Sequence, residues 1–192
     1  MHAVVRLTAN MNTVQRVVVA AEIKNKAFEN WPGYISNGEV IMINHADRAE
    51  AFFKDGYNCA QSVFAAFQDE LGLDIDTALK IASSFGGGMG RLREVCGALT
   101  GLFMVAGIKY GYSDPEDQGS KSEHYQLIQN LAIRFKDQYG SIICRDLLQL
   151  GEQTSDPTPE IRTEQYYQRR PCIEYVRMAA SLLNDEKNLP EK

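Results

Sequence analysis

Four cysteines are the residues of this 192-residue chain with the clearest capacity for chemistry: Cys59, Cys96, Cys144 and Cys172. A deprotonated thiol can bind a metal ion or attack a disulfide. Four cysteines in a chain of this length without a secretory pattern favour metal binding or redox chemistry over a disulfide framework. The plain alternative is that each cysteine fills the core on its own, because free cysteine is among the most buried residues.

The spacing of the cysteines does not choose between these chemistries. No pair matches the C-x-x-C of zinc ribbons and thioredoxin-like sites, and no C-x-x-C-H haem motif occurs. Four thiolates brought together from separate segments would suit tetrahedral Zn or an Fe–S cluster. A metal-free thiol–disulfide site would need one accessible thiolate and a partner thiol. We therefore predict Cys59, Cys96, Cys144 and Cys172 both as redox thiols and as metal ligands.

Glycines cluster on both sides of Cys96. The cluster before it lacks the Lys and Ser/Thr of a P-loop, so a nucleotide site of that type is excluded. Three interpretations remain: a helix end followed by a tight turn, a cradle for an anion, or close approach of the backbone to a cofactor or a thiol pair. The residues that we predict to bind a cofactor are Gly86, Gly87, Gly88, Gly90, Gly97 and Gly101.

Helices must position these residues, because apolar side chains recur with helical period from Asn44 onward and no useful stretch alternates with period 2. We predict an all-α fold, a single compact bundle of about seven helices. Residues 151–170 are predicted to be a loop. The expected helices begin at Asn44, at Asn58 (running to about Leu71), at Asp76 or Thr77, after Gly90, at Ser120 or Ser122, at Ser141 and at Pro171.

This assignment places three cysteines in the first turn of a helix, namely Cys59, Cys144 and Cys172. The partial positive charge of a helix N-terminus stabilises a thiolate there. Cys96 is predicted instead on the apolar stripe of the helix that follows Gly90. Because helices pack through their apolar stripes, we expect the four sulfur atoms to point toward a common interior.

Charged residues beside Cys96 have two interpretations. Arg91, Arg93 and Glu94 can tune a thiolate, or they can form a solvated helix face, and we favour the solvated face. The formal net charge of the chain is -5 and the basic residues are scattered, which argues against nucleic acid as a partner. No run is long and apolar enough for a membrane span, and we expect a cytoplasmic protein.

Residues 1–41 differ from the rest of the chain in lacking a sustained helical period. We predict an N-terminal extension over 1–41, either a mis-assigned start with Met42 as the true start or a disordered arm. The four-cysteine helical domain is predicted over 42–185 and a tail over 186–192.

The segment Cys96-Gly97-Ala98-Leu99-Thr100-Gly101 resembles the signature of the C_GCAxxG_C_C family, which is described as redox-active because of its cysteines. The stretches around Cys59 and the glycine cluster resemble that family as well, and the cysteines at 59, 96, 144 and 172 follow in its order. The resemblance covers roughly residues 44–182.

The resemblance implies redox chemistry at the four cysteines, without an established substrate. It also implies a redox partner or a transporter-linked protein as partner, since genes of this family often lie near transporter genes, and it leaves a homo-oligomer open. With the resemblance, we prefer a thiolate-bound metal or Fe–S centre by a small margin. The alternatives are a metal-free thiol–disulfide oxidoreductase and a non-catalytic helical binding protein with core cysteines.

Overall fold

The computed structural model describes residues 44–151 and 156–183 in full, together with the backbone of four short strands between residues 5 and 41. The predicted tail 186–192 and the rest of the predicted extension lie outside the described residues.

The strands pair antiparallel in the order β1-β2-β4-β3. The sequence did not predict them, because strands of two to four residues are too short to show an alternating pattern. They are β1 (Val5–Leu7), β2 (Arg16–Val19), β3 (Ile35–Ser36) and β4 (Glu39–Ile41).

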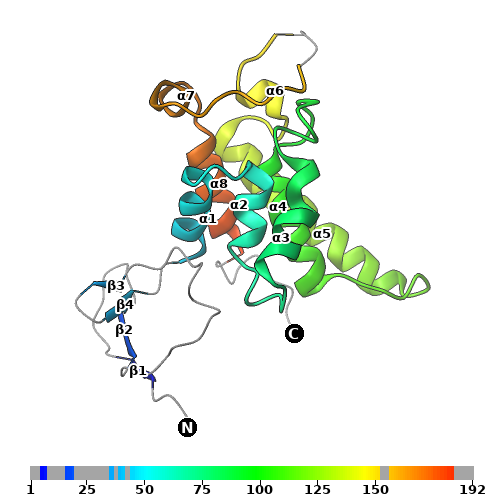
Figure 1. Cartoon of the computed structure of the whole chain (residues 1–192). Coiled ribbons are helices and arrows are strands. Elements are labelled where there is room, and N and C mark those ends of the chain that lie inside the picture. The colour runs from blue at the N-terminus through cyan, green and yellow to red at the C-terminus, as the bar shows by residue number, and fades with distance from the viewer. Residues whose placement is uncertain are drawn as a thin grey trace.

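Helices build the whole of the cysteine-bearing part that the structure describes, which confirms the predicted all-α class (Figure 1). Within residues 44–151 and 156–183 none of them is long and apolar enough to cross a lipid bilayer. The helices are α1 (His45–Lys54), α2 (Cys59–Ala65), α3 (Ile75–Ala82), the 3-10 turn η2 (Ser83–Phe85), α4 (Gly97–Tyr110), α5 (Gln118–Tyr139), α6 (Cys144–Leu147), α7 (Glu164–Arg169) and α8 (Cys172–Leu182).

Two asparagine caps fix the beginnings of α1 and α2 where the sequence predicted them. The Asn44 side chain accepts a hydrogen bond from the backbone N–H of Asp47 at 2.9 Å. Asn58 and Gln61 form a reciprocal capping box, in which each side chain accepts from the other residue's backbone N–H at 3.0 and 3.1 Å. The second cap sets Cys59 as the first residue of α2.

Other helix boundaries differ from the prediction. Asp74, and not Asp76 or Thr77, caps α3, because its carboxylate accepts from the backbone N–H of Thr77 at 2.9 Å. Helix α2 ends at Ala65, earlier than predicted, because the next N–H groups bond only three residues back, as Phe67 does to Phe64 at 3.2 Å. The predicted loop 151–170 contains α7, which the sequence analysis missed.

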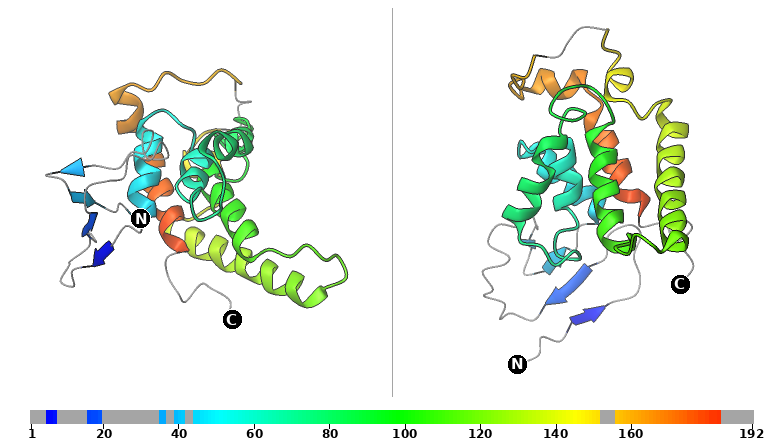
Figure 2. Two further views of the ribbon diagram at one scale, coloured as in Figure 1. Left: turned by 60° about the horizontal axis from the view of Figure 1, so that its bottom comes forward. Right: turned by 90° about the vertical axis from the view of Figure 1, so that its right-hand side faces the viewer.

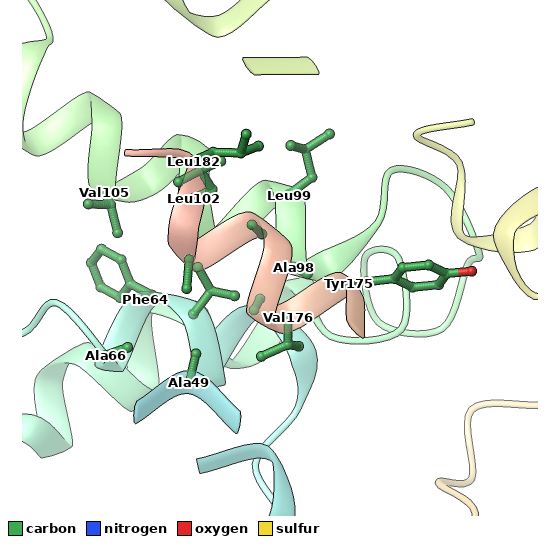
Figure 3. Packing of buried hydrophobic residues seen from close by; sticks show 14 of the residues in the cluster. Ala49, Phe64, Ala66, Ala98, Leu99, Leu102, Val105, Tyr175, Val176 and Leu182 are labelled. Atoms are coloured by element: carbon green, nitrogen blue, oxygen red, sulfur yellow. The ribbon is translucent and has the colours of Figure 1, made fainter. Parts of the chain in front are cut away.

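Helix α4 lies at the centre of the body (Figure 2). Its first six residues are all buried, and its last turn is mostly exposed. It packs against α2, α5 and α8, while α1 packs against α2 and α8. Figure 3 shows Phe64 of α2, Leu102 and Val105 of α4 and Val176 of α8 meeting in this core. Each is fully buried, which stabilises the fold by about 1.5–3 kcal/mol per side chain.

Helices α6 and α7 lie at one end of the body, where α8 begins (Figure 1). Tyr175 of α8 reaches out of the core toward α6, and its hydroxyl donates to the backbone carbonyl of Leu147 at 3.0 Å (Figure 3). This bond joins the start of α8 to α6, so the two segments that carry Cys172 and Cys144 are fixed relative to each other.

The contact between α2 and α4 depends on a glycine. A Cβ atom on Gly101 would lie 2.7 Å from the carbonyl oxygen of Ala60 and 3.1 Å from the Cβ of Val63. The backbones of the two helices therefore approach more closely than any side chain at position 101 would allow. Close helix packing thus accounts for Gly101 without a ligand.

Replacing Gly101 by Ala should lower the free energy of unfolding by about 1–3 kcal/mol, because the added methyl group overpacks the α2–α4 contact. Gly107 lies on the exposed side of the same helix, and its added Cβ would meet nothing within 4 Å. Gly107→Ala should therefore raise stability by about 0.5–1 kcal/mol through helix propensity. Urea unfolding of both variants checks this, and equal effects of the two substitutions would refute the packing argument.

Candidate thiol site

Each of the four cysteines stands at the beginning of a helix. Cys59, Cys144 and Cys172 are the first residues of α2, α6 and α8, in agreement with the sequence prediction. Cys96 is the residue that caps α4, so its predicted position within a helix starting after Gly90 is wrong. The physical reason lies in the backbone that precedes it.

A left-handed backbone segment occupies the place where that helix was expected. Residues 87–91 all have positive φ, between 59° and 69°, and Arg93 has φ of 66°. Three of these residues are glycines, which adopt the conformation without steric cost. For Met89, Arg91 and Arg93, the same conformation costs roughly 1–2 kcal/mol per residue. A right-handed helix cannot run through this segment, so α4 starts only at Gly97.

The left-handed segment is held by backbone pairing with the chain just before α6. Cys96 donates its N–H to Ile142 at 2.8 Å, and Cys144 donates to Glu94 at 2.7 Å. Val95 and Ile143 form the antiparallel bridge between these two bonds. The pairing brings Cys96 and Cys144 together although they are far apart in the sequence.

Glycines on both sides of Cys96 allow this approach. A Cβ on Gly88 would lie 2.7 Å from the Cβ of Cys144, and a Cβ on Gly97 would lie 3.3 Å from the Cβ of Cys59. A Cβ on Gly86 would collide with the side chain of Asn58. Gly88 and Gly97 thus bring the backbone close to two thiols, which is one of the three interpretations considered for the cluster.

Cys59 and Cys172 line the same pocket. The interaction between the two thiols lowers the pKa of Cys172 and raises the pKa of Cys59 well above its ordinary value. The positive charges of Arg170, Arg162 and Arg93 lower the pKa of Cys172 further, against the effect of its burial. Cys172 is therefore the thiol that most readily becomes a thiolate.

The other two thiols are held protonated. Burial raises the pKa of Cys96 to about 12, with the N–H groups of Ala98 and Leu99 opposing the rise. Burial also raises the pKa of Cys144, against the guanidinium of Arg93, whose Nη1 lies 4.0 Å from the Cys144 sulfur. The charges of Cys172, Cys96 and Cys144 also raise the pKa of Cys59, so the four thiols lie near one another.

A pocket of about 260 Å³ opens onto three of these thiols. Cys96 does not line it. Arg93 is only 6% exposed, so the prediction of a solvated helix face is wrong for this residue. Among the predicted glycines, Gly86, Gly87 and Gly90 contribute to the wall, whereas Gly88, Gly97 and Gly101 do not. The thiols and cationic side chains that line the pocket are Cys59, Cys144, Cys172, Arg91, Arg93, Arg162 and Arg170.

Sequence analysis missed one wall of the pocket, formed by Arg162, Tyr166 and Arg170. Arg162 donates to the carbonyls of Phe53 and Tyr57 at 2.6 and 2.8 Å, and Arg170 lies 5.1 Å above the ring of Tyr166. Tyr166 lies on α7, and Arg162 and Arg170 flank this helix, so the wall depends on an element that the sequence analysis missed.

The residues that the structure describes contain no group of three or more His, Cys, Asp or Glu side chains arranged to hold a metal ion. The four thiols lie in one locus but do not present a ligand set. Cys59, Cys144 and Cys172 instead open onto one pocket, and Cys96 lies outside its lining.

The fold and the site define a helical protein whose thiols gather at the beginnings of helices. A family model described as "Putative redox-active protein (C_GCAxxG_C_C)" matches residues 57–186, and the chain belongs to this family. This confirms the resemblance seen around Cys96. No curated protein and no solved structure matches the chain.

As the pH is raised, Cys172 should be the first of the four thiols to react with iodoacetamide, with a midpoint below the ordinary thiol pKa, and Cys96 should be the last. Arg170→Gln should move the Cys172 midpoint upward, since it removes a positive charge that stabilises the thiolate. Arg169→Gln, which removes an exposed charge outside the pocket, is the matched control. Peptide mapping of alkylated protein gives each midpoint, and equal midpoints for the two variants would contradict the assignment.

Proposed function

We propose that this protein is a metal-free thiol–disulfide oxidoreductase that cycles Cys59 and Cys172 between a dithiol and a disulfide. The observation that carries the proposal is the placement of Cys59 and Cys172 on the wall of one pocket, where their interaction lowers the pKa of Cys172 and raises that of Cys59. A reactive thiolate and an adjacent resolving thiol are the two parts that exchange chemistry requires. Both line the pocket, so a small substrate can reach them.

The reaction begins when the Cys172 thiolate attacks one sulfur of a low-molecular-weight disulfide. A bond forms between Cys172 and that sulfur as the substrate S–S bond breaks, and the departing thiolate takes the proton of the Cys59 thiol. The Cys59 thiolate then attacks the Cys172 sulfur and expels the second substrate thiolate. Two electrons pass to the substrate disulfide, and the protein ends with one disulfide. The reverse sequence oxidises a substrate dithiol or two thiols.

The four predicted redox thiols receive different roles in this proposal. Cys172 is the nucleophile and Cys59 the resolving thiol. Cys144 lines the pocket beside Arg93, and its raised pKa makes it a poor competitor for the first attack. Cys96 is buried outside the pocket lining, and its pKa of about 12 suits a packing residue.

The Zn or Fe–S centre that the sequence analysis preferred is less well supported than a dithiol site. Its four ligands would have to be Cys59, Cys96, Cys144 and Cys172, and the described residues are not grouped as a ligand set. A binding protein with inert core cysteines is disfavoured by the opening of three thiols onto a pocket.

Treatment of the reduced protein with 2-hydroxyethyl disulfide should yield the Cys59–Cys172 disulfide as the main product. Cys59→Ser should accumulate a mixed disulfide on Cys172, because the resolving thiol is absent, and Cys172→Ser should lose most of the reactivity. Cys96→Ser is the control and should react as the wild type does. Mass spectrometry of quenched samples distinguishes these species. A main disulfide that involves Cys96, or a Cys59→Ser variant that behaves as the wild type, would end the proposal.

Protein prepared without oxygen should contain much less than one metal ion per chain and no acid-labile sulfide, with Cys172 open to alkylation. Elemental analysis and a sulfide assay measure this directly. One bound Zn or one cluster per chain that protects Cys172 would replace the dithiol proposal by the metal centre. The metal content of the Cys96→Ser variant after reconstitution with the metal or cluster would then report whether Cys96 is a ligand.

A further inference from the structure

The pocket at the thiol pair is strongly cationic in a chain whose formal net charge is -5. Four arginines line it, and Glu160 is the one acidic side chain among the described residues of its lining. Glu160 pairs with Arg170, and the Asp156 carboxylate lies near enough to Arg91 for that charge to lower its pKa, so these two carboxylates offset part of the positive charge. Since basic residues are not in excess elsewhere, this concentration of charge is a property of the site and not of the whole surface.

Neighbouring groups hold two of the arginines in place. Arg162 bonds to two backbone carbonyls at the end of α1, and its guanidinium lies 4.4 Å from the centre of the Phe53 ring. Arg91 donates from Nε to the carbonyl of Asp156 at 2.6 Å. Cations that are already ordered bind an anion without a further loss of side-chain entropy. A carboxylate is one of the anions that a guanidinium binds through charge-assisted hydrogen bonds.

The volume of the pocket limits the ligand to a small molecule. At about 260 Å³ it lies slightly below the ~300 Å³ where pockets for drug-sized ligands begin. We expect a compact disulfide with one sulfur at Cys172 to bring its carboxylates near arginines on either side. Arg91 and Arg93 come from the left-handed segment, and Arg162 and Arg170 flank α7, so cations approach the thiol pair from two walls.

We propose that the pocket selects a low-molecular-weight disulfide or thiol that carries carboxylates, and that Arg91 is a specificity-determining residue for it. The proposal rests on the dithiol function and names its substrate class. The field of the four arginines raises the encounter rate of an anion and disfavours a cation. Because exposed charges are screened, the preference weakens as ionic strength rises.

The first test compares three aliphatic disulfides of similar size: 3,3'-dithiodipropionate, which is a dianion, 2-hydroxyethyl disulfide, which is neutral, and cystamine, which is a dication. Rates of Cys172 modification are divided by those of N-acetylcysteine thiolate with the same reagents. We expect the dianion to exceed the neutral disulfide by about tenfold or more at low salt, and the dication to react more slowly still. Equal normalised rates would overturn the proposal.

Matched variants assign the preference to the pocket. Arg91→Gln and Arg169→Gln each remove one positive charge, but only Arg91 lines the pocket. Arg91→Gln should lose a clear part of the preference for the dianion, Arg169→Gln should keep it, and Arg91→Lys should restore much of what Arg91→Gln loses. If Arg91→Gln does not fold, the comparison of the three disulfides on the wild-type protein still tests the proposal. Equal losses in the two glutamine variants would refute the role of Arg91.

A second measurement separates this inference from the proposed function. Iodoacetate and iodoacetamide both alkylate thiolates and differ by one carboxylate, so their rate ratio at Cys172 reports anion recognition without disulfide exchange. A ratio about tenfold above that of N-acetylcysteine, in a protein that exchanges with none of the disulfides, would retain the anion pocket and reject the dithiol function. An ordinary ratio together with charge-independent disulfide exchange would retain the function and reject the inference.

Discussion

The antiparallel pairing of residues 93–96 with residues 142–145 is the constraint on which the rest of the site depends. It holds the left-handed turn between Gly87 and Arg91 in place, and that turn determines where α4 can begin. The same pairing brings the start of α6 to the start of α4. A local backbone cost of a few kcal/mol is offset by this network of hydrogen bonds, as is common where a protein shapes a functional site.

The electrostatics of the site are asymmetric, and burial and charge explain the asymmetry. Burial alone raises the pKa of every thiol, as it does for Cys96. Cys172 departs from this pattern because it interacts with Cys59 and lies near several arginines. In this member of the family, the pKa of Cys172 is thus lowered, whereas the pKa values of Cys59, Cys96 and Cys144 are raised.

The glycines around Cys96 serve packing and backbone conformation at the same time. Gly101 lets α4 approach α2, and Gly97 lets the start of α4 approach Cys59. Gly88 has positive φ and also faces Cys144 closely, so both its conformation and its lack of a side chain are needed. The signature Cys-Gly-Ala-x-x-Gly is therefore explained by helix contact, and the pocket itself is lined by the glycines that precede it.

The sequence by itself determined the all-α class, the caps at Asn44 and Asn58, the family and the positions of three cysteines at helix beginnings. These features depend on local hydrogen bonding and on the period of apolar residues, which short stretches of sequence record. Only the tertiary structure decided the start of α4, the burial of Arg93, the presence of α7 and the pairing of Cys59 with Cys172. Each of these depends on contacts between residues far apart in the chain, whose energies outweigh local helix propensity and leave no periodic signal in the sequence.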